Sequence, residues 1–262
     1  MAMRARFQLS GPLLALGASA ALLAACGSPA TTGGSSGSGA ASATAAAASG
    51  CAAGAAATGT DVTAPQEADS TVNKTTGSCW ASIKTTAMTV ADVGSAVAGT
   101  SATFQVAWSA QDLYIRAYAV TWPLNNAGGA NWWTSDATEF GISGADDHGG
   151  AFTSGNQYQL AITSDGVLQT SGENGTAASP APTALEQTVA NKGFYTELVV
   201  PWATLQVTKP AKGQKYQFDI GQDFSDSSAN RLAQLVWQAD PTKASSSDWH
   251  QDTSQWGDVT LG

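Results

Sequence analysis

Apolar and polar positions alternate with a period of two over much of the chain beyond residue 100. Between residues 103 and 108, every second position carries a large apolar side chain, namely Phe104, Val106 and Trp108. A short turn then leads into a second apolar run at 113–118, so this region predicts a β-hairpin. Further short strands are predicted at 138–142, 157–163, 194–200, 216–220, 232–237 and 257–261.

Turns rich in Gly, Ser, Asp and Asn separate these predicted strands, and no long amphipathic helix interrupts them. Strands of this kind have one apolar face each, and they bury it when two antiparallel sheets pack together. The pattern therefore predicts an all-β fold, and specifically an antiparallel β-sandwich.

The first 25 residues have the pattern of an export signal. Arg4 and Arg6 precede an apolar run at 13–23, which is shorter than the roughly 20 residues that a membrane-spanning helix needs. The following tetrad Leu-Ala-Ala-Cys resembles the lipobox of bacterial lipoproteins, which implies that Cys26 carries a lipid. An ordinary secretory signal with a small-residue cleavage site is the alternative. We expect a lipoprotein signal peptide at 1–25.

Residues 26–69 are mostly Ala, Gly, Ser and Thr, with almost no large apolar side chain. Such a segment cannot bury enough surface to offset its conformational entropy, so a disordered low-complexity tether is predicted. The remaining residues, 70–262, are enough for one well-cored domain. We therefore expect a folded head outside the cytoplasm, lipid-anchored in the cell envelope, whose contact with the membrane is through the anchor.

The chain carries 20 acidic and 11 basic side chains, which gives a formal net charge of −9. Binding to a phosphate backbone needs a basic surface, so nucleic acid is excluded as the expected partner. Neutral polymers and small ligands suit this surface better than polyanions do.

Three cysteines are present, and lipid on Cys26 leaves Cys51 and Cys79 as a pair. An oxidising compartment favours a disulfide between them. The alternative is one free thiol and one small buried apolar residue, and geometry decides between these two states.

Several segments of the head form an ordered set of motifs. They are Phe104–Trp108 with Asp112–Ile115, Trp133–Phe140, Gly193–Trp202, Phe218–Ile220, the turn at 223–226, Arg231, Leu235–Trp237 and Trp249–Leu261. In this order and at these spacings, they resemble carbohydrate-binding module family 9 over almost the whole head. The resemblance implies a jelly-roll-like sandwich that binds carbohydrate without acting on it.

The resemblance also assigns a ligand site, in which Trp133 and Trp249 hold one sugar residue between them. A pyranose has apolar C–H faces that stack on indole, while its hydroxyl groups project sideways to polar partners. Glu139 matches the hydroxyl-binding acid of the family. Gln159 occupies a place where the family can carry arginine, and Ser246 one where an asparagine occurs. The expected ligand-binding residues are Trp133, Trp249, Glu139, Gln157, Gln159, Gln222 and Ser246.

The tryptophans divide into two expected groups. Trp132 and Trp133 follow a loop rich in Asn and Gly, and Trp249 lies in a polar run, so all three are expected to be exposed. The others fall within or beside predicted strands, where indoles usually pack into the core. The expected packing tryptophans are Trp80, Trp108, Trp202, Trp237 and Trp256.

Members of the family can bind structural calcium, which needs six to eight oxygen ligands. Turn aspartates usually bond their own backbone instead, and this alternative stays open. The candidate metal ligands are Asp136, Asp223 and Asp226, with Asp146 and Asp147 as further oxygen donors.

Two rival functions remain. A glycoside hydrolase needs two carboxylates that face each other across a cleft, but Asp136 and Glu139 lie three apart in a predicted strand and point to opposite faces. A heme or redox relative of the same sandwich superfamily would need axial ligands, for which Met88 and His148 are the candidates. Non-catalytic binding of a glucan or xylan chain end, in support of a separate glycoside hydrolase, is the favoured prediction.

Overall fold

The computed structural model describes residues 50–54, 57–146, 148, 156–171, 178–238 and 253–262. The predicted signal peptide, Cys26 and the predicted tether up to residue 49 lie outside these ranges. Within them, no helix is both long and apolar enough to cross a membrane.

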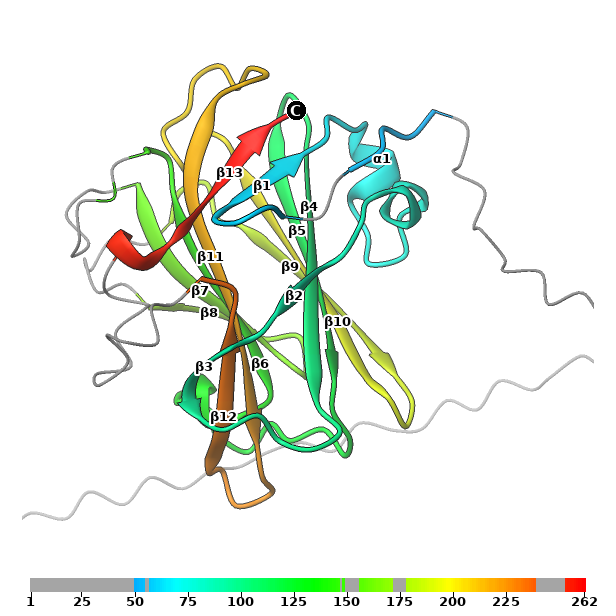
Figure 1. The fold of residues 1–262 in the computed structure, drawn as a ribbon, viewed down its shortest axis with the longest axis vertical. Helices are drawn as coiled ribbons and strands as arrows, with labels where there is room; N and C mark the ends of the chain where they lie inside the picture. The colour runs from blue at the N-terminus through cyan, green and yellow to red at the C-terminus, as the bar shows by residue number, and fades with distance from the viewer. Residues whose placement is uncertain (1–49, 55–56, 147, 149–155, 172–177, 239–252) are drawn as a thin grey trace, which may run out of the picture. The chain divides into compact units, whose positions relative to one another are not determined.

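The described residues form two β-sheets that pack face to face (Figure 1). The larger sheet has eight strands, and the smaller has five. Along its main path the larger sheet contains β1 (Asp61–Ala64), β13 (Gly257–Leu261), β11 (Lys215–Ser225), β6 (Ala137–Ser143), β7 (Gln157–Thr163) and β8 (Leu168–Ser171), and β12 (Arg231–Val236) pairs with both β11 and β3 (Val90–Gly94).

The smaller sheet has its strands to the right of those of the larger sheet in Figure 1. Its order is β2 (Thr86–Met88), β4 (Ser101–Trp108), β5 (Asp112–Val120), β10 (Gly193–Pro201) and β9 (Thr183–Val189). Short helical turns complete the described structure, namely α1 (Asp69–Val72), η1 (Ser78–Ser82), η2 (Trp132–Thr134) and η3 (Thr253–Gln255). The all-β antiparallel sandwich predicted from the alternation is confirmed.

The main core lies between the sheets and is built from the apolar residues of the alternating pattern. Phe104 of β4 reaches across to the larger sheet, where its ring centroid lies 5.6 Å from that of Phe218 and 5.2 Å from that of Trp237. The predicted packing tryptophans are all at most 6% exposed, and this prediction is confirmed.

The predicted hairpin at 103–118 is β4 and β5, and the six other predicted strands are β6, β7, β10, β11, β12 and β13. Five strands were not predicted, namely β1, β2, β3, β8 and β9. Several of these are only three to five residues long, and such short segments give little periodicity to detect.

The predicted start of the head at residue 70 is wrong, because the fold begins earlier. β1 lies inside the predicted tether, where Asp61–Ala64 pairs in parallel with Asp258–Leu261 of β13. This pair adds β1 to the edge of the larger sheet, next to the C-terminal strand (Figure 1). A small-residue strand of this kind has no strong signal of its own and depends on the partner strand for its hydrogen bonds.

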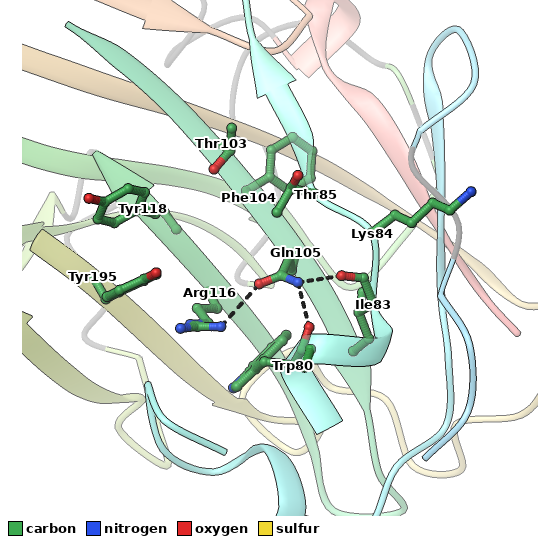
Figure 2. Close-up of a pocket in the computed structure, with 12 residues that line it drawn as sticks. Trp80, Ile83, Lys84, Thr85, Thr103, Phe104, Gln105, Arg116, Tyr118 and Tyr195 are labelled. Carbon is green, nitrogen blue, oxygen red and sulfur yellow. Dashed lines mark hydrogen bonds between the residues drawn. The ribbon is translucent and has the colours of Figure 1, made fainter. Parts of the chain in front are cut away.

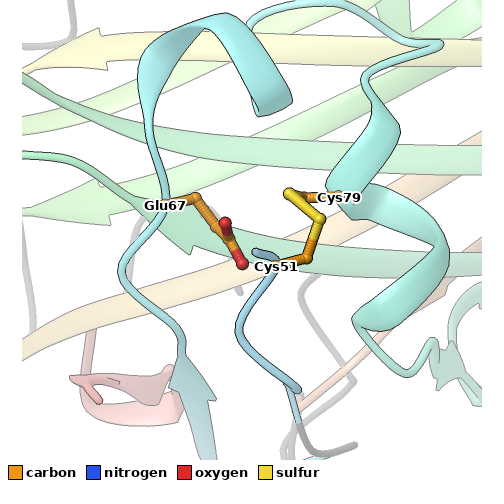
Figure 3. A group of neighbouring side chains, drawn as sticks. All are labelled: Cys51, Glu67 and Cys79. Atoms are coloured by element: carbon orange, nitrogen blue, oxygen red, sulfur yellow. A yellow bond between two sulfur atoms is a disulfide. The ribbon is translucent and has the colours of Figure 1, made fainter. Parts of the chain in front are cut away.

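Cys51 and Cys79 are joined by a disulfide in the structure (Figure 3). The bond holds the segment 50–54 beside η1, on the outer side of the smaller sheet, where Cys79 is buried with Trp80 and Val72. Glu67 lies next to the disulfide and accepts a hydrogen bond from the Ala52 backbone amide at 2.7 Å. Burial raises the pKa of Glu67 above its ordinary value, while this hydrogen bond lowers it in part.

Candidate functional site

Strand alternation gives the larger sheet an outer face that is polar and yet largely buried. In β6, Phe140 and Ile142 point to the core. Glu139 directly precedes Phe140, so its side chain points to the opposite, outer face. The same parity places Gln159 of β7 and Asp223 of β11 on the outer face, and all three side chains are at most 5% exposed.

Glu139 is the centre of a hydrogen-bond network on this outer face. Gln159 Nε2 donates to its Oε2 at 2.8 Å, and Gln234 Nε2 donates to its Oε1 at 3.3 Å. The Arg231 guanidinium approaches the same Oε1 through Nη2, also at 3.3 Å. Four strands, β6, β7, β11 and β12, hold these groups or their neighbours, so the network rests on the rigid part of the sandwich.

Arg231 also forms an ion pair with Asp223, with its Nε 2.6 Å from Oδ1. Burial raises the pKa of Asp223 well above its ordinary range, and the charge of Glu139 raises it further, while Arg231 lowers it. Burial acts to lower the pKa of Arg231, but Asp223 and Glu139 outweigh that effect and raise it. Asp223 Oδ2 is buried without a hydrogen-bond partner among the described residues.

These groups combine a carboxylate acceptor with amide and guanidinium donors in one patch. Each hydroxyl of a sugar both donates and accepts, and a carboxylate can accept from two adjacent hydroxyls in strong, directional bonds. The patch is therefore suited to recognising a polyol.

Trp133 belongs to η2, a helical turn that packs against β11. Its side chain is 40% exposed, and its ring lies edge-on to that of Trp132 with centroids 5.2 Å apart. An exposed indole fixed on one side by a second indole is a platform on which a ligand can stack. The predicted exposure of Trp133 is confirmed, whereas Trp132 is only partly exposed.

Asp136 fixes the loop that carries Trp133. Its carboxylate accepts the backbone amide of Asn125 through Oδ2 and that of Ser225 through Oδ1, both at 2.9 Å. Burial raises the pKa of Asp136 to about 6, and these hydrogen bonds lower it in part. The residue thus ties the loop to the end of β11.

The other predicted ligand residues fall into three groups. Gln157 shares the outer face with Gln159 and Glu139, at the start of β7, and it is buried. Gln222 points the other way, into the core. Its Oε1 accepts from the Thr138 hydroxyl at 2.9 Å. Trp249 and Ser246 lie outside the described residues.

The prediction for Gln222 is therefore wrong, because the register was off by one residue. Thr138 also accepts from Thr196 of β10 at 2.9 Å, so the chain from Gln222 through Thr138 to Thr196 joins the two sheets through the sandwich interior. Its outward-facing neighbour Asp223 takes part in the Glu139 network instead.

Sequence reasoning also missed the roles of Arg231 and Gln234. Strand β12 has a register shift against β11 between Phe224 and Ser225, and another against β3 beside Gln234. When inward and outward positions are counted by simple alternation through such a bulge, side chains beyond it are assigned to the wrong face of the sheet. Arg231 was already part of the motif set, and composition was a further signal, since Arg231 and Gln234 are the polar residues in an otherwise apolar strand.

The three candidate calcium ligands do not come together. Asp136 bonds two backbone amides, Asp223 pairs with Arg231, and Asp226 accepts from Ser228 and Asn230 in its own exposed turn. Among the described residues, two groups place carboxylate, His or Cys ligand atoms within 4.8 Å of one another, and neither group includes these aspartates. One of these groups contains the disulfide of Cys51 and Cys79, and the other is Asp146, His148 and Asp258.

Comparison with known structures shows the same fold. A carbohydrate-binding module of family 9 from Caldicellulosiruptor kristjanssonii superposes with a TM-score of 0.63 in complex with cellotriose, and with 0.64 in complex with glucose. Both are 18% identical and cover 77% of this chain, and the match spans 93% and 95% of those chains. A putative carbohydrate-binding protein from Bacteroides uniformis superposes with a TM-score of 0.56 at 10% identity, over 78% of this chain and 100% of that one.

No curated protein matches the chain. The model of one family, described as carbohydrate family 9 binding domain-like, matches residues 72–262, which is more than half of the sequence. This match agrees with the sandwich and with the motifs found in the sequence. The chain therefore belongs to the carbohydrate family 9 binding domain-like family.

Proposed function

We propose that this domain binds a neutral sugar residue, at the end of a glucan or xylan chain or in a short oligosaccharide, and does not transform it. The observation that carries the proposal is the Glu139 network on the outer face of the larger sheet. It offers a buried carboxylate beside the amides of Gln159 and Gln234 and the guanidinium of Arg231. The sugar lies between Trp133 and Trp249, with Gln157 as a further polar contact.

Membership in a carbohydrate-binding family supports this function. Two solved structures with the same fold contain cellotriose and glucose, which makes gluco-oligosaccharides the first ligands to test. The carboxylates of the network also argue against hydrolysis, because Asp223 is engaged by Arg231 and stands beside Glu139 instead of across a cleft.

The expected affinity is moderate. Covering both faces of one sugar removes on the order of 150 Å² of apolar surface, worth roughly 4 kcal/mol. Association costs offset part of the gain from stacking and hydrogen bonds, so the dissociation constant is expected between about 1 μM and about 1 mM.

The proposed setting is the cell envelope, with lipid on Cys26 as the anchor. From there the domain would hold polysaccharide ends close to the cell, where a separate glycoside hydrolase degrades them. Enrichment of such an enzyme with the anchored protein on insoluble cellulose or xylan tests this part. If the anchored protein retains no more hydrolase than bare polysaccharide does, the partnership is refuted.

The experiment for the binding function is a fluorescence titration of the purified protein with cellobiose, xylobiose and glucose. The double variant Trp133→Ala, Trp249→Ala removes both proposed platforms, and Trp122→Ala removes an indole that is 49% exposed elsewhere on the loop. Saturable binding in the parent and in Trp122→Ala, with none in the double variant, supports the proposal. Failure of the folded parent to bind any of these sugars, or unchanged binding in the double variant, refutes it.

A further inference from the structure

A second pocket lies on the outer face of the smaller sheet, on the side of the sandwich away from the Glu139 network (Figure 2). It is an open cavity of about 510 Å³. Strands β4, β5 and β10 form its floor, and the segment from η1 to β2 forms one wall. The proposed sugar slot does not involve this pocket, although Gln105 and Tyr195 fall within two of the sequence motifs.

Strand register arranges the floor of the pocket in two rows of facing side chains. In the first row, Arg116 of β5 lies between Gln105 of β4 and Glu197 of β10. In the second row, Tyr118 lies between Thr103 and Tyr195. The wall contributes Trp80, Ile83, Lys84 and Thr85.

Gln105 is held by the wall of the pocket. Its Nε2 donates to the backbone carbonyls of Ile83 and of Trp80, the latter at 2.7 Å (Figure 2). With both amide protons engaged by carbonyls, its Oε1 is the acceptor that remains, and Arg116 Nη1 donates to it at 3.2 Å. The orientation of the guanidinium is therefore fixed before any ligand arrives.

Aromatic rings surround the guanidinium of Arg116. Its Cζ lies 4.1 Å from the centroid of the Tyr195 ring and 5.7 Å from that of Trp80. Tyr118 stacks on Tyr195 with the ring centroids 4.4 Å apart. Cation–π contacts hold a charge in place, but they do not neutralise it as a carboxylate would.

Arg116 has no ionic partner within 4 Å among the described residues, and its Nε is buried without a hydrogen bond. The Arg116 side chain is partly buried, and a charge partly removed from water is normally paired, because desolvation disfavours it. Lys84 lies at the rim, also outside every ion pair of the described residues, and adds a second positive charge. The pocket is thus locally positive on a protein of net charge −9.

The nearest carboxyl group, that of Glu197, does not supply the missing negative charge. It is fully buried, and its Oε2 accepts a hydrogen bond from Trp80 Nε1 at 3.2 Å. Burial raises the pKa of Glu197 to about 8, while Trp80 and Arg116 lower it in part. Near neutral pH the group is therefore mostly uncharged.

We propose that the Arg116 pocket binds the carboxylate of an acidic sugar, such as a uronic acid residue of a glycan. A guanidinium pairs with a planar carboxylate in a charge-assisted bond, and Nη2 of Arg116 lies outside the bond to Gln105. The rings of Tyr118 and Tyr195 stand beside it to contact the apolar face of the sugar, and the hydroxyls of Thr85 and Thr103 reach the same cavity. The choice of a sugar acid over other carboxylates rests on the proposed carbohydrate-binding function.

Two sites on opposite sheets allow one molecule to engage two positions of a branched glycan. A neutral chain end in the Glu139 site and an acidic substituent in the Arg116 pocket would then bind with a shared effective concentration, which raises the avidity above that of either site.

The experiment is calorimetric titration of the full protein with glucuronate, glucuronamide and glucose, each with and without saturating cellobiose. Glucuronate is expected to bind at least tenfold more tightly than the uncharged glucuronamide, equally well in the presence of cellobiose, and more weakly at high salt. Acetate serves as the non-sugar carboxylate. If acetate binds as well as glucuronate, the pocket recognises a carboxylate alone and the assignment of a sugar acid is overturned.

Arg116→Gln is expected to reduce glucuronate affinity at least tenfold and to leave cellobiose affinity unchanged. Lys212→Gln removes one positive charge from an exposed turn and is the matched control. Tyr118→Ala, at a partly exposed ring, tests the pocket without touching the Gln105–Arg116 bond.

The outcomes separate this proposal from the proposed function. Binding of cellobiose without binding of glucuronate, or glucuronate binding that persists in both Arg116→Gln and Tyr118→Ala, overturns the Arg116 pocket and leaves the neutral-sugar site standing. Binding of glucuronate without any neutral sugar supports the pocket and refutes the Glu139 site.

Discussion

The outer faces of the two sheets are built from the same alternating strands, and yet they differ in what covers them. On the smaller sheet, α1 and η1 lie over the strands, and Trp80, Cys79 and Val72 form a second apolar cluster with Tyr114 and Val199. On the larger sheet, the outward side chains around Glu139 are carboxylates, amides and a guanidinium that bond one another.

The comparison shows two ways to bury a carboxyl group on the outside of a sheet. Glu197 of the smaller sheet is covered by the chain's own segment and has one hydrogen-bond donor, Trp80. Glu139 of the larger sheet has three donor side chains on two strands, β7 and β12. Burial with few donors favours the uncharged acid at Glu197.

The first prediction concerns Glu197, where the largest effect is expected. Its pKa rises from an ordinary 4.5 to about 8 in the folded protein, so the folded state keeps a proton that the unfolded state releases. Stability therefore falls as pH rises from about 4.5 to about 8, and it is constant above that. Glu197→Gln cannot lose a proton, and its free energy of unfolding should exceed that of the parent by roughly 4 kcal/mol above pH 8, with little difference below pH 4.5.

Urea denaturation of the parent and of Glu197→Gln at pH 4, 6 and 9 measures this difference. The other buried acids titrate in both proteins, so their contributions cancel. Parallel stability curves for the two proteins would mean that Glu197 is not held as the neutral acid.

The second prediction concerns the disulfide that clips residues 50–54 to the smaller sheet. It closes a loop of 28 residues, and loss of such a link costs about 3 kcal/mol of stability in the chain-entropy description. The double variant Cys51→Ser, Cys79→Ser should unfold at correspondingly lower denaturant and still bind cellobiose with parental affinity, because the Glu139 site lies on the other sheet. A reducing agent should destabilise the parent and leave the double variant unchanged, and equal stability of parent and variant contradicts the prediction.

The third prediction tests the larger sheet through Glu139→Gln. The substitution keeps the shape of the side chain but removes its charge, and hydrogen bonds to charged groups are worth about 2 kcal/mol. Cellobiose affinity measured by calorimetry should therefore fall by roughly 30-fold. Glu186→Gln, on the edge strand β9, removes the same charge far from the network and should leave the affinity unchanged.

The fourth and smallest effect separates the inner and outer glutamines of the larger sheet. Gln222→Ala breaks the hydrogen bond to Thr138 inside the sandwich and should lower stability by about 1 kcal/mol without changing sugar affinity. Gln234→Ala, which removes a donor to Glu139, should weaken sugar binding. A loss of sugar affinity in Gln222→Ala would contradict this prediction and would indicate that Gln222 contributes to sugar binding.

The candidate site was predicted in part from the sequence. Glu139, Gln157 and Gln159 were predicted as ligand-binding residues from the family resemblance, and the regular strands β6 and β7 place all three on one face. Gln222 was predicted from the resemblance, although its even-numbered neighbours Phe218 and Ile220 already point to the core. The role of Arg231 was missed where β11 and β12 pair through a register shift. A bulge of one residue changes no local pattern but reverses which side chains point outward.

The sequence by itself determined the longer regular strands, the all-β class and the separation of core tryptophans from the exposed Trp133, since each follows from neighbours one or two residues apart. Only the tertiary structure decided that β1 belongs to the sheet, that Cys51 reaches Cys79, and that Gln105, Arg116 and Glu197 share a row. Those arrangements depend on pairing between segments far apart in the chain. Strand pairing and register are set by contacts across the sheets, and local periodicity carries no information about them.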